Sequence, residues 1–422
     1  MSTQHEVNPY SFTMTGGLGV YDLHWPEQNI TMQVSHFTDK PLTAEVWVDS
    51  QRPNGGHIAS GTLNLLSNVA KGTFEKACAR RDDGVDWYTL IEQLCTAVVR
   101  DYRKGSPEIE LTGEVLKDVS FEDKWVAEPL LLADQPTLIF GEGGSGKSYL
   151  AIYLAVLLGE GISSGGIKVT EPLKVLYLDW ETSQQEISER LVRVRRGLGL
   201  DLYAQRNVIY KHMSSGIRED LSEIQSIVTR RDIQVVVLDS VGAAVAGEPE
   251  SASMVIAYFN AIRKLKVTSL SVDHKNREGT IFGSSYKRNY SRLMYDVKSA
   301  PGTDLSIEMG LFHEKTNNTP YMKPMGWVLR FDNNPDTEAV TFERRDVKDT
   351  ALESDMSVPD RIENALSNGP KSVQSLAEEL EKSTSFISKE LSKGRDKRFV
   401  NLERGTWANA YRPDGGAFNE EL

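Results

Sequence analysis

Cysteine is almost absent from this sequence of 422 residues. The two that occur, Cys78 and Cys95, have sixteen residues between them. Neither belongs to a C-x-x-C pair or to a cluster of cysteine and histidine, which argues against a disulfide framework and against a zinc site. We therefore expect two buried free thiols in a reducing cytoplasm.

Long apolar segments are also lacking. The longest run, Tyr149 to Leu158, has ten residues, whereas a helix that spans a bilayer needs roughly 20. The first 25 residues lack the charged start and apolar stretch of a signal peptide. The sequence therefore predicts a cytoplasmic protein without a membrane contact.

Positive charge is in deficit. The chain carries 48 Lys and Arg against 60 Asp and Glu, a formal net charge of −12. This balance excludes a protein that is covered in nucleic acid, so any contact with DNA must be local. The 39% hydrophobic and 26% charged content is typical of a globular protein, and the length suggests two or three domains.

The first region, residues 1–115, is expected to be a small α+β accessory domain of unknown role. A helical pattern covers Asp86 to Tyr102, and no catalytic constellation is evident. Turn signals separate four short β-type runs: Tyr10 to Met14, Ile30 to Phe37, Ala44 to Val48 and His57 to Leu65.

The second region, residues 120–345, alternates apolar runs of strand length with helical patterns. That alternation predicts an α/β fold, a mostly parallel sheet covered by helices. Later runs follow one another without helices and are expected to be antiparallel. The expected strands are Thr137 to Phe140, Val175 to Leu178, Val208 to Tyr210, Val235 to Leu238 and Thr268 to Val272, then Leu305 to Phe312, Trp327 to Phe331 and Ala339 to Phe342.

The third region follows a polar linker at 346–357. Residues 358–412 are expected to form three helices and two short strands, an order that resembles a winged helix-turn-helix, and a tail covers 413–422. The expected helices are Pro359 to Leu366, Val373 to Leu380 and Thr384 to Ser392.

A complete phosphate-binding motif lies between an expected strand and an expected helix. The segment is Gly141-Glu142-Gly143-Gly144-Ser145-Gly146-Lys147-Ser148, which matches G-x-x-x-x-G-K-[ST], and Tyr149 follows it. Glycines let backbone N–H groups turn toward phosphates at a helix N-terminus. The motif predicts that Lys147 binds the phosphates of ATP and that the Ser148 hydroxyl ligates Mg²⁺.

Carboxylates end two of the expected strands. The run Val235 to Leu238 delivers Asp239, the position from which an aspartate helps to hold Mg²⁺ in P-loop ATPases. A second strand ends near Asp179 and Glu181. Hydrolysis needs a group that orients the attacking water, and Glu181 is our candidate, with Asp179 as the competitor.

Together these motifs resemble the RecA-like ATPases of the plasmid RepA-type hexameric helicase family, often labelled AAA-type ATPases. The resemblance covers residues 122–332, and Lys315 is one of the residues that carry it. It rests on the segment Trp125 to Ile139, the P-loop, Tyr177-Leu178-x-x-Glu181, Asp239-Ser240, His274 and the run from Gly283-Ser284-Ser285 to Arg292.

The resemblance implies roles for four residues. Glu181 is the catalytic carboxylate and His274 senses the γ-phosphate. Arg292 is the finger that acts on the neighbouring subunit's nucleotide, with Lys287 and Arg288 as competitors. Lys315 matches the lysine of a K-x-R element in replicative helicases, although Asn317 stands where they carry arginine.

Two segments are expected to touch DNA. Rings of this type bind a strand on loops that follow the fourth and fifth core strands, here Gly242 to Ala252 and Lys275 to Phe282, of which the second carries Lys275 and Arg277. From Lys382 to Arg404 seven Lys and Arg face three acids, which favours a phosphate-facing helix-and-wing surface. The cationic positions are 382, 389, 393, 395, 397, 398 and 404.

The sequence thus predicts a DNA-associated ATPase, a homo-oligomer and in particular a hexameric replicative-type DNA helicase. It would hold ATP and Mg²⁺, a single strand in its pore and duplex DNA at the winged helix. The alternatives are a RecA/RadA-like recombination or repair ATPase, and an ATP-switched DNA-binding regulator or loader.

Overall fold

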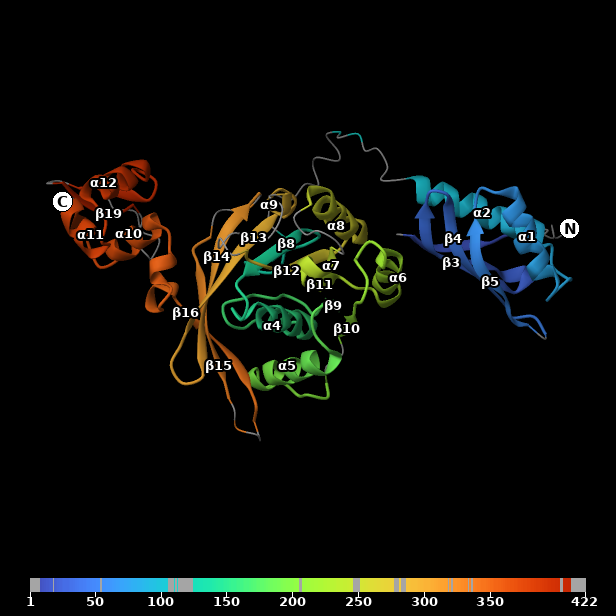
Figure 1. Cartoon of the computed structure of the whole chain (residues 1–422), viewed down its shortest axis with the longest axis horizontal. Helices are drawn as coiled ribbons and strands as arrows, with labels where there is room; N and C mark the ends of the chain where they lie inside the picture. The colour runs from blue at the N-terminus through green and yellow to red at the C-terminus, as the bar shows by residue number, and fades with distance from the viewer. Residues whose placement is uncertain are drawn as a thin grey trace, which may run out of the picture.

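Three parts follow one another along the chain (Figure 1). The structure is a computed structural model, which describes residues 8–410 except 18, 54, 105–109, 111, 113–123, 205–206, 246–250, 277–280, 282–285, 318, 320–321, 333, 335–336 and 403–404. No helix in these described stretches combines the length and apolarity needed to cross a bilayer.

The N-terminal part is an antiparallel sheet covered on one face by two helices. Along β4 buried and more exposed residues alternate, because successive strand residues point to opposite faces. The helices are α1 (Asn68–Ala79) and α2 (Trp87–Lys104). The strands pair in sequence order: β1 (Thr13–Gly17), β2 (Val20–Trp25), β3 (Ile30–Asp39), β4 (Leu42–Ser50) and β5 (Gly56–Asn64).

Both cysteines lie in the core of this part as free thiols. Burial raises the pKa of Cys78 and of Cys95 to about 12, so both stay protonated at neutral pH. The sequence patterns identified α2 and four of the strands but missed β2 and α1. β2 does show a strand pattern, because buried Tyr21, Leu23 and Trp25 alternate with Asp22 and His24, and the sequence interpretation overlooked it. α1 buries only Phe74 and Cys78, so its pattern is weak.

The central part is a RecA-like α/β core built on one nine-stranded sheet. Its order is β10-β9-β11-β12-β8-β13-β14-β15-β16, and the strands from β10 to β13 are parallel. Their bounds are β8 (Pro136–Gly141), β9 (Val175–Asp179), β10 (Val208–His212), β11 (Val235–Asp239), β12 (Thr268–His274) and β13 (Leu293–Pro301).

The last three strands of this sheet are antiparallel, as the sequence predicted. They are β14 (Ser306–Thr316), β15 (Met325–Phe331) and β16 (Val340–Arg345). The prediction overlooked β13, which pairs in parallel with β8 and antiparallel with β14 and so joins the two halves of the sheet. A small hairpin of β6 (Trp125–Ala127) and β7 (Leu131–Leu132) precedes β8.

Helices cover both faces of the parallel strands. One apolar cluster joins one sheet face to α4 and α5, and another joins the opposite face to α6, α7 and α8. Burial on both faces explains why β9 and β11 are nearly continuous apolar runs that end in a carboxylate. The bounds are α4 (Lys147–Glu160), α5 (Gln184–Gly197), α6 (Leu221–Arg231), α7 (Val241–Ala244), α8 (Ala252–Leu265) and α9 (Tyr286–Tyr290).

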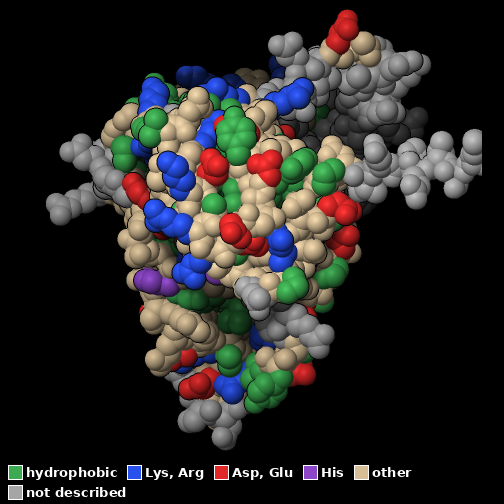
Figure 2. All heavy atoms as spheres, turned by 90° about the vertical axis from the view of Figure 1, so that its right-hand side faces the viewer, with side chains coloured by type: hydrophobic (Ala, Val, Ile, Leu, Met, Phe, Trp, Pro, Cys, Tyr) green, Lys and Arg blue, Asp and Glu red, His purple; other side chains and the backbone are tan. Residues whose placement is uncertain are grey.

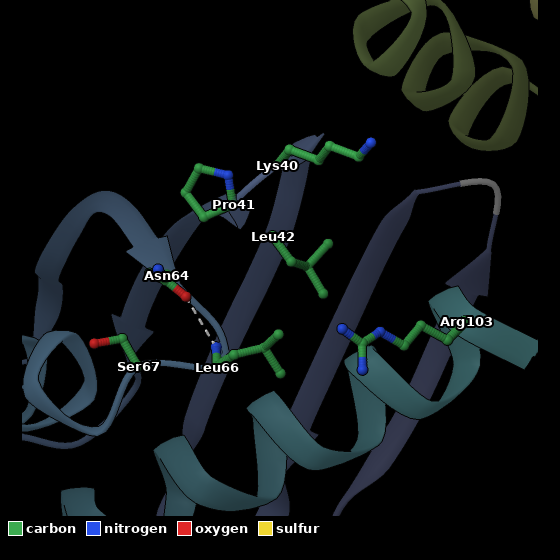
Figure 3. Close-up of a pocket in the computed structure, with 7 residues that line it drawn as sticks. All are labelled: Lys40, Pro41, Leu42, Asn64, Leu66, Ser67 and Arg103. Atoms are coloured by element: carbon green, nitrogen blue, oxygen red, sulfur yellow. Dashed lines mark hydrogen bonds between the residues drawn. The ribbon is translucent and has the colours of Figure 1, made fainter.

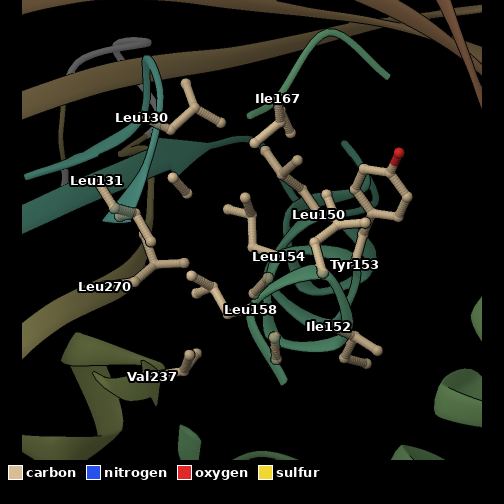
Figure 4. Packing of buried hydrophobic residues seen from close by; sticks show 14 of the residues in the cluster. Leu130, Leu131, Leu150, Ile152, Tyr153, Leu154, Leu158, Ile167, Val237 and Leu270 are labelled. Carbon is tan, nitrogen blue, oxygen red and sulfur yellow. The ribbon is translucent and has the colours of Figure 1, made fainter. Parts of the chain in front are cut away.

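Helix α4 is apolar all round, because it is enclosed by the sheet, α5 and the β6–β7 hairpin. Every residue from Leu150 to Leu158 is at most 1% exposed. Figure 4 shows Leu150, Leu154 and Leu158 of this helix among Leu131, Ile167 and Leu270 from other elements. The ten-residue run that is too short for a bilayer is therefore the central core helix, which fixes the position of the P-loop before it.

The segment expected to be a linker is partly packed. It contains two one-turn 3-10 helices, Val347–Asp349 and Glu353–Asp355. Val347, Leu352 and Met356 are buried against Phe312 of β14. In the sequence these three apolar side chains are irregularly spaced among acidic residues, so their pattern did not predict a packed segment.

The C-terminal part is small and has its own core, with Leu376, Ile387, Leu391 and Phe399 buried in it. Its elements follow the order helix, strand, helix, helix, strand, strand, and the strands form a sheet in the order β17-β19-β18. They are α10 (Val358–Leu366), β17 (Lys371–Ser372), α11 (Val373–Glu379), α12 (Thr384–Lys393), β18 (Phe399–Asn401) and β19 (Thr406–Asn409). The tail at 413–422 lies outside the described residues.

Candidate active site

The P-loop connects the end of β8 to the start of α4, at the edge of the sheet where the parallel strands end. Gly146, which caps α4, has φ +86°, a left-handed conformation that costs glycine little. A Cβ on Gly141 would lie 2.3 Å from the Val297 carbonyl oxygen, whereas one on Gly143 or Gly144 would meet nothing within 4 Å. The inner side of the loop is thus closed by β13, and its outer side is open for a ligand.

Lys147 is folded into this loop and is 5% exposed. Its ammonium donates to the carbonyl oxygens of Gly141 at 3.0 Å and Glu142 at 2.6 Å. Burial lowers the pKa of Lys147, although Asp239 and Glu181 act in the opposite direction. No carboxylate in the described part of the chain forms an ion pair with this buried cation, so phosphate oxygens fit it as counter-charge.

Asp239 lies at the end of β11 and is 3% exposed. Its two carboxylate oxygens differ in the hydrogen bonds that they accept. The Tyr177 hydroxyl donates to Oδ2 at 2.7 Å, while buried Oδ1 receives no well-formed hydrogen bond from a described residue. Burial raises the pKa of Asp239, and the hydroxyls of Tyr177 and Ser148 oppose the rise.

Mg²⁺ on a nucleotide is held by one or two protein oxygens plus phosphates and water. The unpartnered Asp239 oxygen beside the Ser148 hydroxyl fits this requirement. The ion would supply positive charge to the phosphates. The described residues contain no group of three or more His, Cys, Asp and Glu side chains arranged for a metal, so the donor set suits a nucleotide-bound ion better than a resident metal centre.

Glu181 lies just beyond the end of β9, and its side chain is 36% exposed. Its Oε1 accepts from the Ser240 hydroxyl and lies 3.2 Å from Nε2 of His274. The contact with His274 is the largest influence that lowers the pKa of Glu181, assisted by Ser240 and Lys147. Glu181 is therefore an anion at neutral pH, suited to hold and polarise a water molecule.

Asp179, the competing carboxylate, is 1% exposed and is occupied within its own turn. It accepts from the backbone N–H of Glu181 at 3.0 Å and that of Thr182 at 3.2 Å. It also accepts from the hydroxyls of Thr182 at 2.7 Å and Tyr210 at 3.1 Å. Four donors leave it fixed in the protein, so Asp179 orients the segment that carries Glu181.

His274 ends β12 beside a buried ion pair. The backbone N–H of His274 donates to Asp273, whose carboxylate lies 2.7 Å from the Lys287 ammonium, and both charged side chains are at most 1% exposed. Lys287 was one of the three cations considered for a finger that acts on another subunit. Its burial inside its own chain makes that role untenable.

The other finger candidates lie at the opposite edge of the sheet from the P-loop. The backbone N–H of Arg292 donates to Pro136 at the start of β8, while Val297 pairs with Gly141 at its end. Pro136 and Gly141 are five positions apart along β8, a distance of about 16 Å. The exposed Arg292 side chain therefore lies far from its own phosphate site.

Lys315 lies at the same edge and binds its own chain. Its ammonium donates to the carbonyl oxygens of Ser291 at 2.8 Å and Asn289 at 3.3 Å, and also to that of Arg288, so it caps α9. Desolvation lowers the pKa of Lys315, helped by Arg292 and Arg288. Arg288 is 55% exposed and lies 3.7 Å from Glu314.

The structure describes only some of the core residues that were expected to contact DNA. Lys275 forms an ion pair with Asp296 at 2.7 Å, with both side chains 9% exposed, so it does not face a channel. The first expected loop begins with helix α7, and its residues 246–250 lie outside the described part. Arg277 and the segment Gly283-Ser284-Ser285 also lie outside it.

In the C-terminal part, intramolecular contacts occupy some of the expected phosphate-binding cations. Arg398 is bound to Asp360 and Glu363, and Lys393 to Glu390, while Arg395 lies over the Trp407 ring. Arg404 is outside the described residues. Three lysines remain exposed and form no ion pair with a described side chain: Lys382, Lys389 and Lys397.

The N-terminal part has a shallow pocket of about 490 Å³ far from the P-loop. Figure 3 shows Arg103 of α2 directed across it toward Leu42 and Leu66. Seen from the end of the molecule that this part forms, cationic and acidic side chains alternate over the surface (Figure 2). Neither feature brings together a catalytic group of side chains.

The nine-stranded RecA-like core with a P-loop and a strand-end carboxylate defines a P-loop ATPase. Residues 114–280 match the family model described as AAA domain. No curated protein matches the chain significantly.

Two archaeal structures are similar to this chain. A KaiC-like protein of Pyrococcus horikoshii OT3 is 14% identical with a TM-score of 0.37, covering 51% of this chain and 93% of its own. The flagellar accessory protein FlaH of Methanocaldococcus jannaschii is 15% identical with a TM-score of 0.34, covering 50% and 90%.

Proposed function

We propose that this chain is the subunit of a ring-forming, ATP-driven DNA motor of the replicative-helicase type. The observation that carries the proposal is the separation of Arg292 from its own P-loop. An arginine that assists hydrolysis from the far edge of the sheet must act on a neighbour's nucleotide. A ring of identical subunits repeats that contact at every interface.

In this proposal ATP lies between two subunits. Lys147 and the Ser148–Asp239 pair of one subunit hold the phosphates and Mg²⁺. Glu181 orients the attacking water, and His274 reports on the γ-phosphate through its contact with Glu181. The neighbour's Arg292 stabilises charge that develops during phosphoryl transfer, a contribution of about 10³–10⁵ in rate.

The C-terminal part supports the DNA association. Its order of helices and strands resembles that of a winged helix-turn-helix, a comparison in which α12 would take the place of the recognition helix. Lys382, just before α12, and Lys389, on α12, are cations available for phosphates. This exposed helix also favours a second candidate, an ATP-switched DNA-binding regulator or loader. Two assays separate the candidates. The motor should displace one strand of a DNA duplex, whereas the regulator should bind one preferred duplex sequence.

Mixing two inactive variants tests the shared site. Lys147→Ala and Arg292→Ala should each be inactive, and their mixture should recover part of the ATPase activity. Some interfaces in the mixture pair an intact Lys147 with an intact Arg292. The control mixes Lys147→Ala with Glu181→Gln, which damage the same half-site and should not complement. Failure to recover activity despite proven co-assembly would exclude a shared site.

A further inference from the structure

We propose that Tyr177 is a positioning residue that sets the orientation of Asp239 for Mg²⁺, an inference that rests on the proposed ATP·Mg²⁺ site. The Tyr177 hydroxyl donates to Oδ2 of Asp239 at 2.7 Å. Oδ1 of the same carboxylate is buried and has no well-formed hydrogen bond from a described residue. The hydroxyl thus occupies one oxygen and leaves the other for the metal.

Strand register explains how the tyrosine reaches this carboxylate. β9 and β11 are parallel neighbours in which Tyr177 lies opposite Val237 and Asp179 opposite Asp239. Residues two apart on a strand share a face, so Tyr177 and Asp239 are diagonal neighbours on one face, within reach of a long side chain. Tyr177 is 1% exposed among apolar side chains, so its ring is held by packing and its hydroxyl is confined to this one partner.

The bond restricts the rotation of the carboxylate. Hydrogen bonds from outside the ligand set orient ligating carboxylates, and their removal commonly costs about 10–100-fold in metal affinity. Without the hydroxyl, the Asp239 carboxylate would turn more freely, because Oδ2 would lose the hydrogen bond that it accepts from Tyr177. The consequence falls on Mg²⁺ and leaves the backbone contacts of the P-loop to phosphate unchanged.

The test is Tyr177→Phe, which keeps the ring and removes the hydroxyl. A fluorescent ATP analogue is titrated with Mg²⁺ present and with EDTA. The expected result is a Mg²⁺ requirement about 10-fold higher or more, with unchanged affinity in EDTA. Saturating Mg²⁺ should restore binding, a recovery that a merely structural defect would not show.

Two other tyrosines provide matched controls. The Tyr258 hydroxyl is buried and lies 2.9 Å from Ser271, and the Tyr210 hydroxyl donates to Asp179. Tyr258→Phe and Tyr210→Phe remove comparable hydrogen bonds that do not involve Asp239. Both should keep the Mg²⁺ requirement of the unmodified protein, and thermal unfolding reports separately on the stability of all three variants.

A folded Tyr177→Phe with an unchanged Mg²⁺ requirement would overturn the inference while the ATP site stands. If the unmodified protein itself shows no Mg²⁺-dependent nucleotide binding, the proposed site fails and the inference with it. Where Tyr177→Phe does not fold, 4-fluorophenylalanine in place of Tyr177 decides the matter, because fluorine fills the place of the hydroxyl and donates no hydrogen bond. It should raise the Mg²⁺ requirement, and an unchanged requirement would overturn the inference.

Discussion

The ammonium of Lys287 lies 2.7 Å from the carboxylate of Asp273, and the protein buries both side chains completely or almost so. Asp273 precedes His274, which contacts Glu181, while Lys287 belongs to α9, which leads to Arg292. One buried ion pair therefore connects the strand at the nucleotide site with the segment that would serve the neighbouring site.

Replacing Lys287 by alanine should destabilise the fold, because it leaves Asp273 buried without its counter-charge. The expected loss is about 3–5 kcal/mol in the free energy of unfolding, measured by denaturant titration. Arg292→Ala is the matched control, since its exposed side chain makes no ion pair with a described residue and should leave stability unchanged. Equal stabilities of the two variants would contradict this assignment.

Glu181→Gln and Asp179→Asn should separate catalysis from structure. Glu181→Gln should bind ATP and fold normally but hydrolyse it about 10²–10⁴ times more slowly, because the anionic acceptor for the water proton is removed. Asp179→Asn should lower stability by about 1–3 kcal/mol, because it replaces an anion that accepts four hydrogen bonds. Steady-state ATPase rates and unfolding curves measure both. An inactive but stable Asp179→Asn beside an active Glu181→Gln would reverse the roles.

Lys147→Ala should abolish ATP hydrolysis and weaken nucleotide binding while the protein stays folded. The ammonium binds P-loop carbonyl oxygens, so its removal deletes phosphate-binding charge rather than packing of the apolar core. Circular dichroism and an ATPase assay check the two statements. Normal turnover by a folded Lys147→Ala protein would refute the assignment of the nucleotide site.

Acid should destabilise the core through His313. This buried ring receives the Met322 N–H on Nδ1 and lies 2.9 Å from the Lys315 carbonyl at Nε2, an arrangement for the neutral form. Burial lowers the pKa of His313 in the folded protein. In the unfolded chain the histidine has its ordinary pKa of about 6.5, so the unfolded chain takes up a proton first as pH falls. The free energy of unfolding should therefore decrease from about pH 7.5 downward through 6.5.

The matched variant for this prediction is His313→Gln, which cannot titrate. It should be less stable than the unmodified protein at pH 8, because glutamine loses the stacking of the imidazole ring on Tyr295, whose ring centroid lies 5.0 Å away. Its stability should fall less steeply between about pH 7.5 and 5.5. Thermal unfolding at stepped pH gives both slopes, and parallel curves would show that His313 is not responsible.

Removing three exposed lysines of the C-terminal part should weaken DNA binding. Lys382→Ala, Lys389→Ala and Lys397→Ala combined should reduce the dependence of log affinity on log salt by about 0.9 for each phosphate that these lysines neutralise. ATPase activity without DNA should not change. The control is Lys168→Ala, at a 73% exposed lysine of the core. An unaltered salt dependence in the triple variant would favour a protein-binding role for this part.

The sequence determined the architecture because the relevant signals are local. Eight consecutive residues make the P-loop, and their chemistry lies in the backbone conformation that glycines permit. Strands buried on both faces are rich in apolar residues, so the parallel core could be recognised from the runs around Val175 and Val235. β13 was overlooked because its apolar start gives way to Asp296 and Lys298, charges that the fold accommodates through ion pairs with Lys275 and Asp355.

Tertiary structure decided which charged and polar side chains are available for chemistry. Spacing along the chain could not separate Lys287 from Arg292, because the partner of Lys287, Asp273, is 14 residues away on β12 and only folding brings it to α9. Asp179 and Glu181 also differ in burial and in hydrogen-bond donors, and both differences arise only when the chain folds. The sequence assigned no partner to the Tyr177 hydroxyl, which reaches Asp239 because β9 and β11 pair. The free energy of burying a charge or hydroxyl depends on its partner, and that partner is a property of the fold.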